Sequence, residues 1–178
     1  MSVVVRQDFL PPWILAAAQA SFPTKDWEYW HKYPNGKRAT VDHSRIPPGC
    51  KLALDHMATT IQTPKDVFPD MEFYGAGLHL MVPGTKLGLH YDAQKHPTRL
   101  WKRTGSAVLV LDERAPNDGA LRIQSTDHPV SENMLIIFPA EYEHSVSKVI
   151  RSDRRTLAVF YWVQDKNASG SETATFLT

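Results

Sequence analysis

The chain has 178 residues, a mass of 20.1 kDa and a net charge of +1, with 42% hydrophobic and 22% charged residues. This size fits one domain with its own buried core, and the near-neutral charge excludes a chain-wide positive field for nucleic acids. Apolar runs such as residues 134–138 are far shorter than the roughly 20 residues that cross a bilayer, and the start lacks a secretory pattern. Cys50 is the only cysteine, which excludes an internal disulfide, so we expect a cytoplasmic protein without a membrane or nucleic-acid partner.

Residues 1–72 are predicted to form a helical and irregular support. The β-branched residues 3–5 predict a short strand, and two consecutive prolines can start an alanine-rich helix over residues 13–20. A second helix is predicted over residues 52–61. Between the helices, an aromatic segment contains the Pro-Asn-Gly turn at residues 34–36, which indicates an irregular or hairpin region.

The rest of the chain consists of short β-rich runs separated by turn residues. The runs cover residues 73–82, 88–92, 106–113, 119–125, 134–140, 143–150 and 155–163. Many short strands at fairly even spacing predict two packed sheets with hairpin connections. Several runs are apolar on both faces, as expected where helices cover one sheet and its other face lines a closed core. We therefore expect a single mainly-β domain over residues 1–178, with a β core at residues 73–164 and a polar tail at residues 165–178.

A candidate metal site begins with the sequence His90-Tyr91-Asp92. In a strand, residues two apart project from the same face with Cα atoms roughly 6.6 Å apart, so His90 and Asp92 can converge on one ion while Tyr91 faces away. His144 starts a later apolar strand and can supply a third ligand. Two histidines and one carboxylate leave other positions open, which is the facial triad of non-haem Fe(II) oxygenases. Zinc accepts the same ligands, so a zinc hydrolase and a cupin-like jelly-roll that binds a small ligand without oxidation stay open as alternatives.

An arginine at the mouth of the last strand offers a carboxylate clamp. Arg154 lies ten residues after His144 and alternates along the predicted strand with Thr156, Ala158 and Phe160. The planar fork of a guanidinium can bind a carboxylate through two parallel hydrogen bonds, as a dicarboxylate cosubstrate requires. Arg155 is the adjacent competitor, and the strand register decides between them. The alternative is that these arginines belong to a solvated basic hairpin.

Four motifs in order carry a resemblance to a known family. They are HYD at residues 90–92, NDGALRI at 117–123, FPAEYEHSV at 138–146 and RRTLAVFYW at 154–162. In this order they resemble the Fe(II)- and 2-oxoglutarate-dependent dioxygenases of the prolyl 4-hydroxylase type, over about residues 73–162. The resemblance implies a mainly-β fold with a double-stranded β-helix (jelly-roll) core and N-terminal supporting helices. It also implies the iron ligands His90, Asp92 and His144, with Arg154 pairing to the distal carboxylate of 2-oxoglutarate.

The departures from the family pattern sharpen these expectations. In related branches the sixth residue after the arginine is usually tryptophan; Phe160 takes this place and favours Arg154 over Arg155. The family often has a cosubstrate-binding tyrosine on the strand after the first histidine, where this chain offers Ser106 and Val110. We therefore expect Ser106 or Thr156 to assist Arg154. The retained Asp92 favours hydroxylation, because related halogenases replace the carboxylate with a small residue.

The resemblance implies Fe(II), 2-oxoglutarate and O2, with ascorbate as a reductant, and release of succinate and CO2. The substrate is an unidentified peptide, protein or small molecule, and a prolyl or other peptidyl side chain is the expected target. Residues 93–105 follow the first ligands directly and are a candidate lid; the alternative is a solvated loop with one aromatic in the core. Candidate substrate contacts are Trp101, Arg99 and Phe160. The sequence leaves the oligomeric state open.

Overall fold

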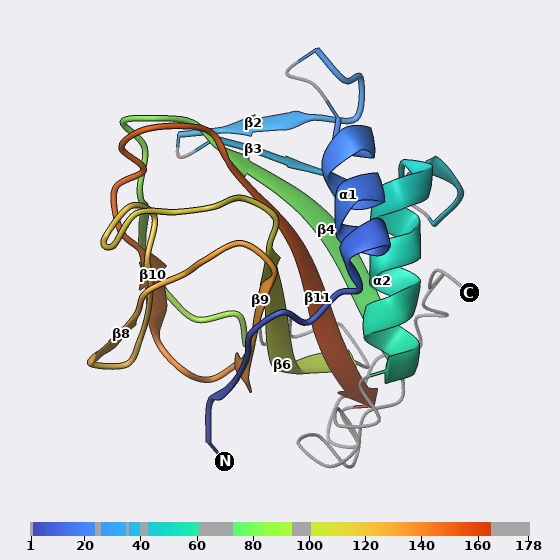
Figure 1. Cartoon of the computed structure of the whole chain (residues 1–178). Coiled ribbons are helices and arrows are strands. Elements are labelled where there is room, and N and C mark those ends of the chain that lie inside the picture. Colours follow the sequence, from blue (N-terminus) through green and yellow to red (C-terminus); the bar gives the residue numbers. More distant parts are fainter. Residues whose placement is uncertain are drawn as a thin grey trace.

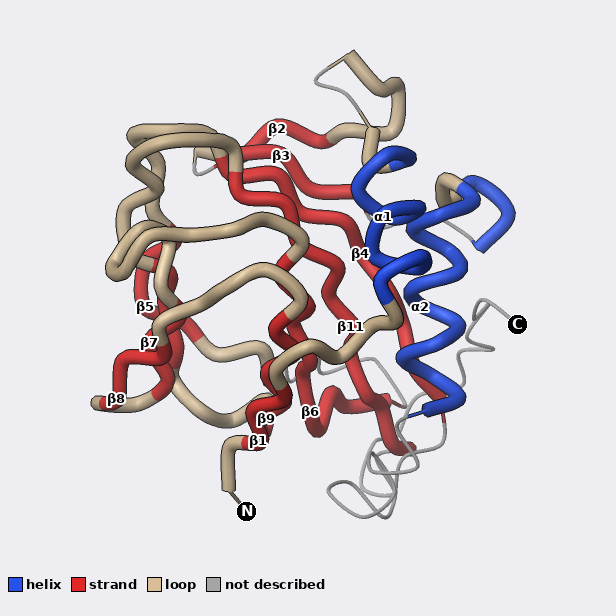
Figure 2. The backbone as a smooth tube through the Cα atoms, viewed as in Figure 1, coloured by secondary structure: helices blue, strands red, loops and turns tan. Residues whose placement is uncertain are grey.

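The computed structural model describes residues 2–23, 26–34, 36–39, 43–60, 73–93 and 101–164. Two β-sheets lie face to face, and two helices cover the far side of the larger sheet (Figure 1). Figure 2 shows the same order of layers: the smaller sheet, the larger sheet and then the helices. The predicted two-sheet, mainly-β jelly-roll architecture is confirmed. The expected tail at residues 165–178 lies outside the described residues.

The two helices pack closely against each other. Helix α1 (Pro12–Ser21) starts at a proline, as predicted, and α2 (Pro48–Thr60) begins at Pro48 rather than at residue 52, because proline also suits the first turn of a helix. A Cβ on Gly49 would lie 2.0 Å from the carbonyl oxygen of Ala17, so only glycine allows this approach. A short 3-10 helix, His43–Arg45, precedes α2. No helix in the described ranges has the length and apolarity needed to cross a membrane.

The larger sheet has the strand order β1-β9-β6-β11-β4-β3-β2, and its neighbours pair antiparallel. The last strand of the chain, β11, lies between β6 and β4, so it is hydrogen-bonded on both sides. The predicted hairpin at residues 34–36 is confirmed, since β2 and β3 flank this turn. In chain order the strands are β1 (Val4–Arg6), β2 (His31–Tyr33), β3 (Gly36–Ala39), β4 (Phe73–Met81), β6 (Trp101–Val110), β9 (Met134–Pro139) and β11 (Arg154–Gln164).

The smaller sheet has the order β5-β10-β7-β8 and is made of short strands. These are β5 (Leu87–His90), β7 (Leu121–Ile123), β8 (Thr126–His128) and β10 (His144–Val146). Strand β8 was missed from the sequence because Thr-Asp-His contains no apolar residue and offers no alternating pattern. Three of the four strands match predicted runs.

Alternate residues of the long strands pack into two different hydrophobic cores, one on each face of the larger sheet. On β11, Leu157, Val159 and Tyr161 pack against the cluster that includes the helices, whereas the alternate positions, beginning with Arg154, face the smaller sheet. The inter-sheet cluster joins residues of both sheets: Met81, Val110, Leu121, Ile123, Val130, Met134, Ile136, Phe138, Val146 and Val149. The larger sheet is therefore covered on both faces, which explains why its strands lack a polar side.

Candidate active site

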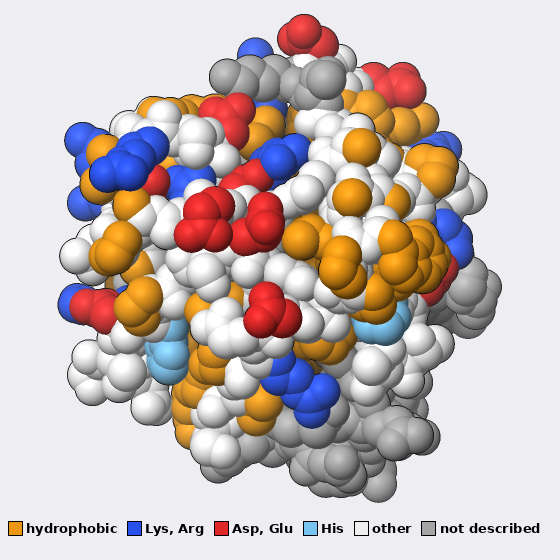
Figure 3. Space-filling model, in the orientation of Figure 1, with side chains coloured by type: hydrophobic (Ala, Val, Ile, Leu, Met, Phe, Trp, Pro, Cys, Tyr) orange, Lys and Arg blue, Asp and Glu red, His pale blue; other side chains and the backbone are white. Residues whose placement is uncertain are grey.

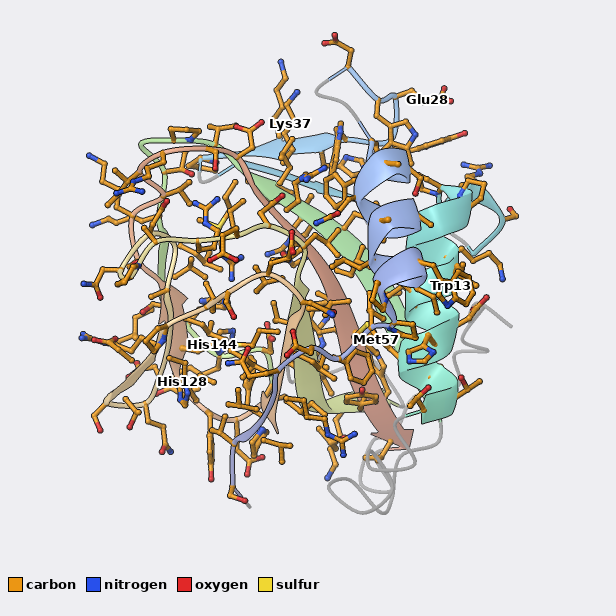
Figure 4. All side chains as sticks on the ribbon, viewed as in Figure 1. Trp13, Glu28, Lys37, Met57, His128 and His144 are labelled. Carbon is orange, nitrogen blue, oxygen red and sulfur yellow. The ribbon has the colours of Figure 1, made fainter. Side chains whose placement is uncertain are left out.

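The ends of two short strands bring two histidines together. His90 is the last residue of β5 and His144 the first of β10, and the antiparallel register places them directly opposite each other. Their ring centroids lie 4.1 Å apart. Figure 4 shows His144 at β10 and, farther out, His128 at the edge strand β8. Strand pairing, rather than closeness in sequence, thus builds the histidine pair.

Asp92 completes the predicted triad from just beyond β5. The prediction placed it within the strand, but β5 ends at His90 and Asp92 lies in the following bend. Its Oδ2 is 3.5 Å from His144 Nε2, and its Oδ1 is 3.9 Å from His90 Nε2. One ligand atom of each residue lies within 4.8 Å of those of the other two. Tyr91, as predicted, faces away and is 56% exposed.

Backbone carbonyls orient both imidazoles. His90 Nδ1 lies 2.8 Å from the carbonyl oxygen of Gly88, and His144 Nδ1 lies 2.9 Å from that of Tyr142. A carbonyl can only accept a hydrogen bond, so each Nδ1 carries a proton, and in the neutral form of either ring the lone pair is then on Nε2. The pKa of His144 is lowered chiefly by burial, which outweighs the opposing influence of Asp92, and its imidazole is therefore neutral. The arrangement suits a divalent metal.

Two side chains of β6 brace the carboxylate of Asp92. Ser106 donates its hydroxyl to Asp92 Oδ2 at 2.6 Å, and Arg103 Nη1 lies 3.4 Å from Oδ1. The guanidinium of Arg103 stacks over the rings of Phe160, at 3.9 Å from its centroid, and Trp162, at 4.9 Å. Each carboxylate oxygen of Asp92 thus lies near one histidine and one of these two side chains. Side-chain exposure rises from 6% at His144 to 30% at His90, so the triad opens to solvent on the His90 side.

Arg154 enters the same inter-sheet space from the larger sheet. It is the first residue of β11, pairs with Met81 of β4 and is only 3% exposed. Its Nε donates to the carbonyl oxygen of Gly119 at 3.0 Å, whereas its Nη2 is buried without a hydrogen-bond partner in the described residues. Burial, followed by the nearby Arg114, lowers its pKa to about 10, so it remains a cation at neutral pH. A buried cation with an unused N–H group can bind an anion that enters this space.

Arg155, the competing candidate, points to the other face of the sheet. Its Nε donates to Asp112 Oδ1 at 2.8 Å, and its Nη1 donates to the carbonyl oxygen of Gln19 on α1 at 3.0 Å. Its charge is thus neutralised by an acid beneath the helices. Strand parity separates the two arginines, and only Arg154 shares a space with the triad.

A buried ion pair holds the loop that contacts Arg154. Arg114 Nη2 donates to Asp118 Oδ1 at 2.7 Å, and both side chains are sealed from solvent. Asp118 also accepts the backbone N–H of Ile150 at 2.7 Å, and these hydrogen bonds keep its pKa low despite burial. Gly119, next in the chain, has φ +67°, and a Cβ there would lie 2.8 Å from Arg154 Cδ. The loop therefore fixes the position of the arginine.

The remaining predicted residues fall into three groups. Thr156 lies beside Arg154 on the inter-sheet face, and its buried Oγ1 has no hydrogen-bond partner in the described residues. Ser106, expected beside Arg154, instead contacts Asp92, and Phe160 lies under Arg103. Trp101 begins β6, which corrects the expectation that residues 101–105 belong to a lid. The Trp101 side chain, Arg99 and the segment 94–100 lie outside the described residues.

Sequence reasoning left two residues of this space unassigned. Arg103 was read only as a charge in the expected lid, because its position on β6 was not foreseen. His79 was given no role, although it is the single polar side chain in the apolar run GLHLMV at residues 77–82. The register places it opposite Thr156, on the inter-sheet face. A polar residue at an inward position of a buried strand was the available signal.

Comparison with known proteins identifies the family. The model of the 2OG-Fe(II) oxygenase superfamily matches residues 76–163, about half of the chain. No curated protein sequence matches it significantly. Among solved structures, a Pseudomonas putida prolyl-4-hydroxylase is similar with TM-score 0.75 and 22% identity, over 92% of this chain and 93% of that one.

Two further structures share the fold at lower identity. A Trichoplax adhaerens prolyl hydroxylase in complex with a hypoxia inducible factor peptide has TM-score 0.70 and 12% identity, over 96% of this chain and 87% of that one. The alpha-ketoglutarate-dependent carbocyclase SnoK from nogalamycin biosynthesis has TM-score 0.70 and 13% identity, over 90% and 79%. The triad and the buried cation suit the metal and the 2-oxo acid that this family uses. The chain belongs to the 2OG-Fe(II) oxygenase superfamily, has the fold of prolyl 4-hydroxylases, and is an enzyme that uses Fe(II), 2-oxoglutarate and O2.

Proposed function

We propose that this enzyme hydroxylates a C–H bond of a peptidyl side chain, with proline as the first candidate, and releases succinate and CO2. His90, Asp92 and His144 hold the iron, and Arg154 with Thr156 holds the distal carboxylate of 2-oxoglutarate. The observation that carries the proposal is the buried guanidinium of Arg154, which has an unused N–H group and faces the same space as the triad. Ser106 steadies Asp92 rather than contacting the cosubstrate.

Each residue has a distinct physical task in this reaction. The histidines direct Nε2 towards the metal position because their Nδ1–H groups donate to carbonyl oxygens. Iron bound there supplies the chemistry that couples decarboxylation of 2-oxoglutarate to insertion of one oxygen atom into the substrate, while the other enters succinate. Arg154 orients the cosubstrate by neutralising its far end where the guanidinium is buried from solvent. The overall balance consumes one C–H bond, one O2 and one 2-oxoglutarate per product.

The substrate side of the site opens beside His90. Arg103, Phe160 and Trp162 form a stacked cation and aromatic wall next to Asp92. A wall of this kind packs against an uncharged ring or short apolar side chain, which fits a prolyl target. On the face drawn in Figure 3, basic and acidic side chains are interspersed, so this face has no field of one sign that would select a strongly charged partner. Phe160 is the described candidate for direct substrate contact; Trp101 and Arg99 stay predictions.

The first test is anaerobic binding of Fe(II) and 2-oxoglutarate, followed by the visible metal-to-ligand charge-transfer band. We expect a band for the native protein and for His128→Ala, and none for His144→Ala. Absence of the band from the native protein would overturn the iron and 2-oxoglutarate assignment. A zinc hydrolase or a passive binding jelly-roll would also form no succinate in air.

The second test addresses the substrate. Proline-containing peptides and matched peptides with alanine in place of proline are incubated with Fe(II), 2-oxoglutarate, ascorbate and air. Succinate and a mass gain of one oxygen atom, on the proline peptides alone, are the expected result. Oxygen transfer to alanine peptides or to small molecules only would reject the prolyl target while leaving the oxygenase assignment intact.

A further inference from the structure

Three buried polar atoms that have no hydrogen-bond partner among the described residues face the inter-sheet space. They are Arg154 Nη2 and Thr156 Oγ1 on β11 and His79 Nε2 on β4. The β4–β11 register pairs His79 directly with Thr156, and Arg154 with Met81, so all three side chains project from one face of the larger sheet. An unpaired buried polar atom destabilises the fold, because it has lost its hydrogen bond to water without gaining another. Three of them in one place indicate that a ligand provides the missing partners.

The imidazole of His79 lies between the two ends of this space. Its centroid is 6.4 Å from that of Phe160, the ring on which Arg103 stacks. It is also close enough to both Arg154 and Asp92 for each charge to influence its pKa. One end of the space holds the anion-binding cation and the other a metal ligand. In the strand register His79 pairs with Thr156, between the level of Arg154 and the level at which Ser106 pairs with Phe160 and holds Asp92, so His79 lies between these two ends.

His79 is suited to donate a hydrogen bond as a neutral imidazole. Burial, and then the guanidinium of Arg38, lowers its pKa to about 3, with Arg154 and Arg103 acting in the same sense and Asp92 opposing them. The ring is therefore neutral at physiological pH. A neutral imidazole can carry its proton on Nε2 and donate it to a carboxylate oxygen, and a hydrogen bond to a charged acceptor in a dry site is strong.

We propose that His79 is a further cosubstrate-binding residue, whose Nε2–H donates to a carboxylate oxygen of 2-oxoglutarate beside Arg154 and Thr156. This inference rests on the proposed function, because it needs the same ligand in the same space. On β6, Val110 pairs with Thr156 and faces the same space, but its side chain has no polar group. The proposal therefore assigns to His79 on β4 the polar contact with the cosubstrate that β6 lacks at this level.

The test compares His79→Leu and His79→Gln with the native enzyme, with His128→Leu as a matched control for loss of an imidazole. Dissociation constants for 2-oxoglutarate are measured anaerobically with Fe(II) from the charge-transfer band, without turnover. We expect His79→Leu to bind at least 10-fold more weakly, His79→Gln to recover part of the affinity through its amide N–H, and His128→Leu to match the native protein.

Thermal unfolding of the metal-free protein provides a second readout that a merely structural histidine would not satisfy. Because His79 Nε2 has no partner to lose, His79→Leu should unfold at the same temperature as the native protein or higher, yet gain less from added 2-oxoglutarate and Fe(II). Equal affinity of His79→Leu and the native enzyme would overturn the inference, and so would a lower unfolding temperature with unchanged affinity. Absence of binding by the native enzyme would instead overturn the proposed function.

Discussion

The two ends of the inter-sheet space are built in different ways. At the metal end, ligands come from the ends of short strands and a bend, and local hydrogen bonds to carbonyl oxygens and to Ser106 orient them. At the anion end, Arg154 and Thr156 belong to a long central strand, and their positions follow from its register. The metal end is partly open, whereas Arg154 is sealed. The open end suits exchange of substrate, and the sealed end suits a fixed anchor.

Removing a metal ligand should have the largest effect. Asp92→Ala deletes the carboxylate that faces both histidines, so we expect Fe(II) affinity to fall at least 100-fold, measured anaerobically by equilibrium competition with a chelator. Ser106 and Arg103 lose their contacts with Asp92 in this variant, so unfolding of the metal-free protein is measured as well, to separate lost metal affinity from lost stability. Retention of iron by Asp92→Ala would place the metal centre elsewhere in the chain.

Arg154→Met removes the guanidinium from the anion end, and Arg155→Met is the matched control at the neighbouring position. At saturating Fe(II), we expect 2-oxoglutarate affinity to fall about 100-fold for Arg154→Met and to stay within about threefold for Arg155→Met. Stability should show the reverse order. Arg155→Met removes the cation that neutralises Asp112, leaving it the backbone N–H of residue 155, and should cost about 1 kcal/mol in urea unfolding; methionine at position 154 removes no partner of an acid. A larger affinity loss at Arg155 would contradict the parity argument.

Ser106→Ala tests whether the Ser106 hydroxyl supports iron binding through Asp92 or supports 2-oxoglutarate binding beside Arg154. Loss of the 2.6 Å hydrogen bond to Asp92 should weaken Fe(II) binding about 10-fold, as is usual for a residue that orients a metal ligand. Affinity for 2-oxoglutarate at saturating iron should then remain near the native value. The opposite pattern, with intact iron binding and weak cosubstrate binding, would return Ser106 to the anion end.

A last prediction concerns the acid stability of the metal-free protein. The pKa of His79 is about 3 in the fold and near 6.5 when unfolded, so the unfolded chain binds the extra proton between these values. This contribution is fully present above the unfolded pKa and is lost as the pH falls towards 3, with a slope of at most about 1.4 kcal/mol per pH unit. Urea unfolding at about pH 7 and about pH 5 should show a smaller loss in His79→Leu than in the native protein. Equal losses would mean that His79 is not buried neutral.

The metal end was largely predictable from sequence, and the anion end only in part. His90, Asp92 and His144 could be assigned because their types and strand positions fit a known coordination pattern. Arg154 could be separated from Arg155 only by assuming a register, which β11 follows. His79 could not be assigned a role, because that role depends on its position opposite Thr156. The pairing of two strands that are far apart in the sequence cannot be deduced from a single sequence. The Arg114–Asp118 pair depends on loop closure for the same reason.

The Gly119 turn has a consequence for cosubstrate choice. Its carbonyl oxygen accepts a hydrogen bond from Arg154, and its missing side chain leaves room for the arginine stem, so a backbone atom anchored by a buried ion pair sets how far the guanidinium stands from the triad. Under the proposed assignment, the loop determines the length of the diacid that can reach from the guanidinium of Arg154 to the triad. Because the ion pair that anchors the loop is buried, substitutions at surface residues should leave that length unchanged. A bulkier residue at position 119 would displace the guanidinium of Arg154 and should therefore change which length of 2-oxo diacid binds best.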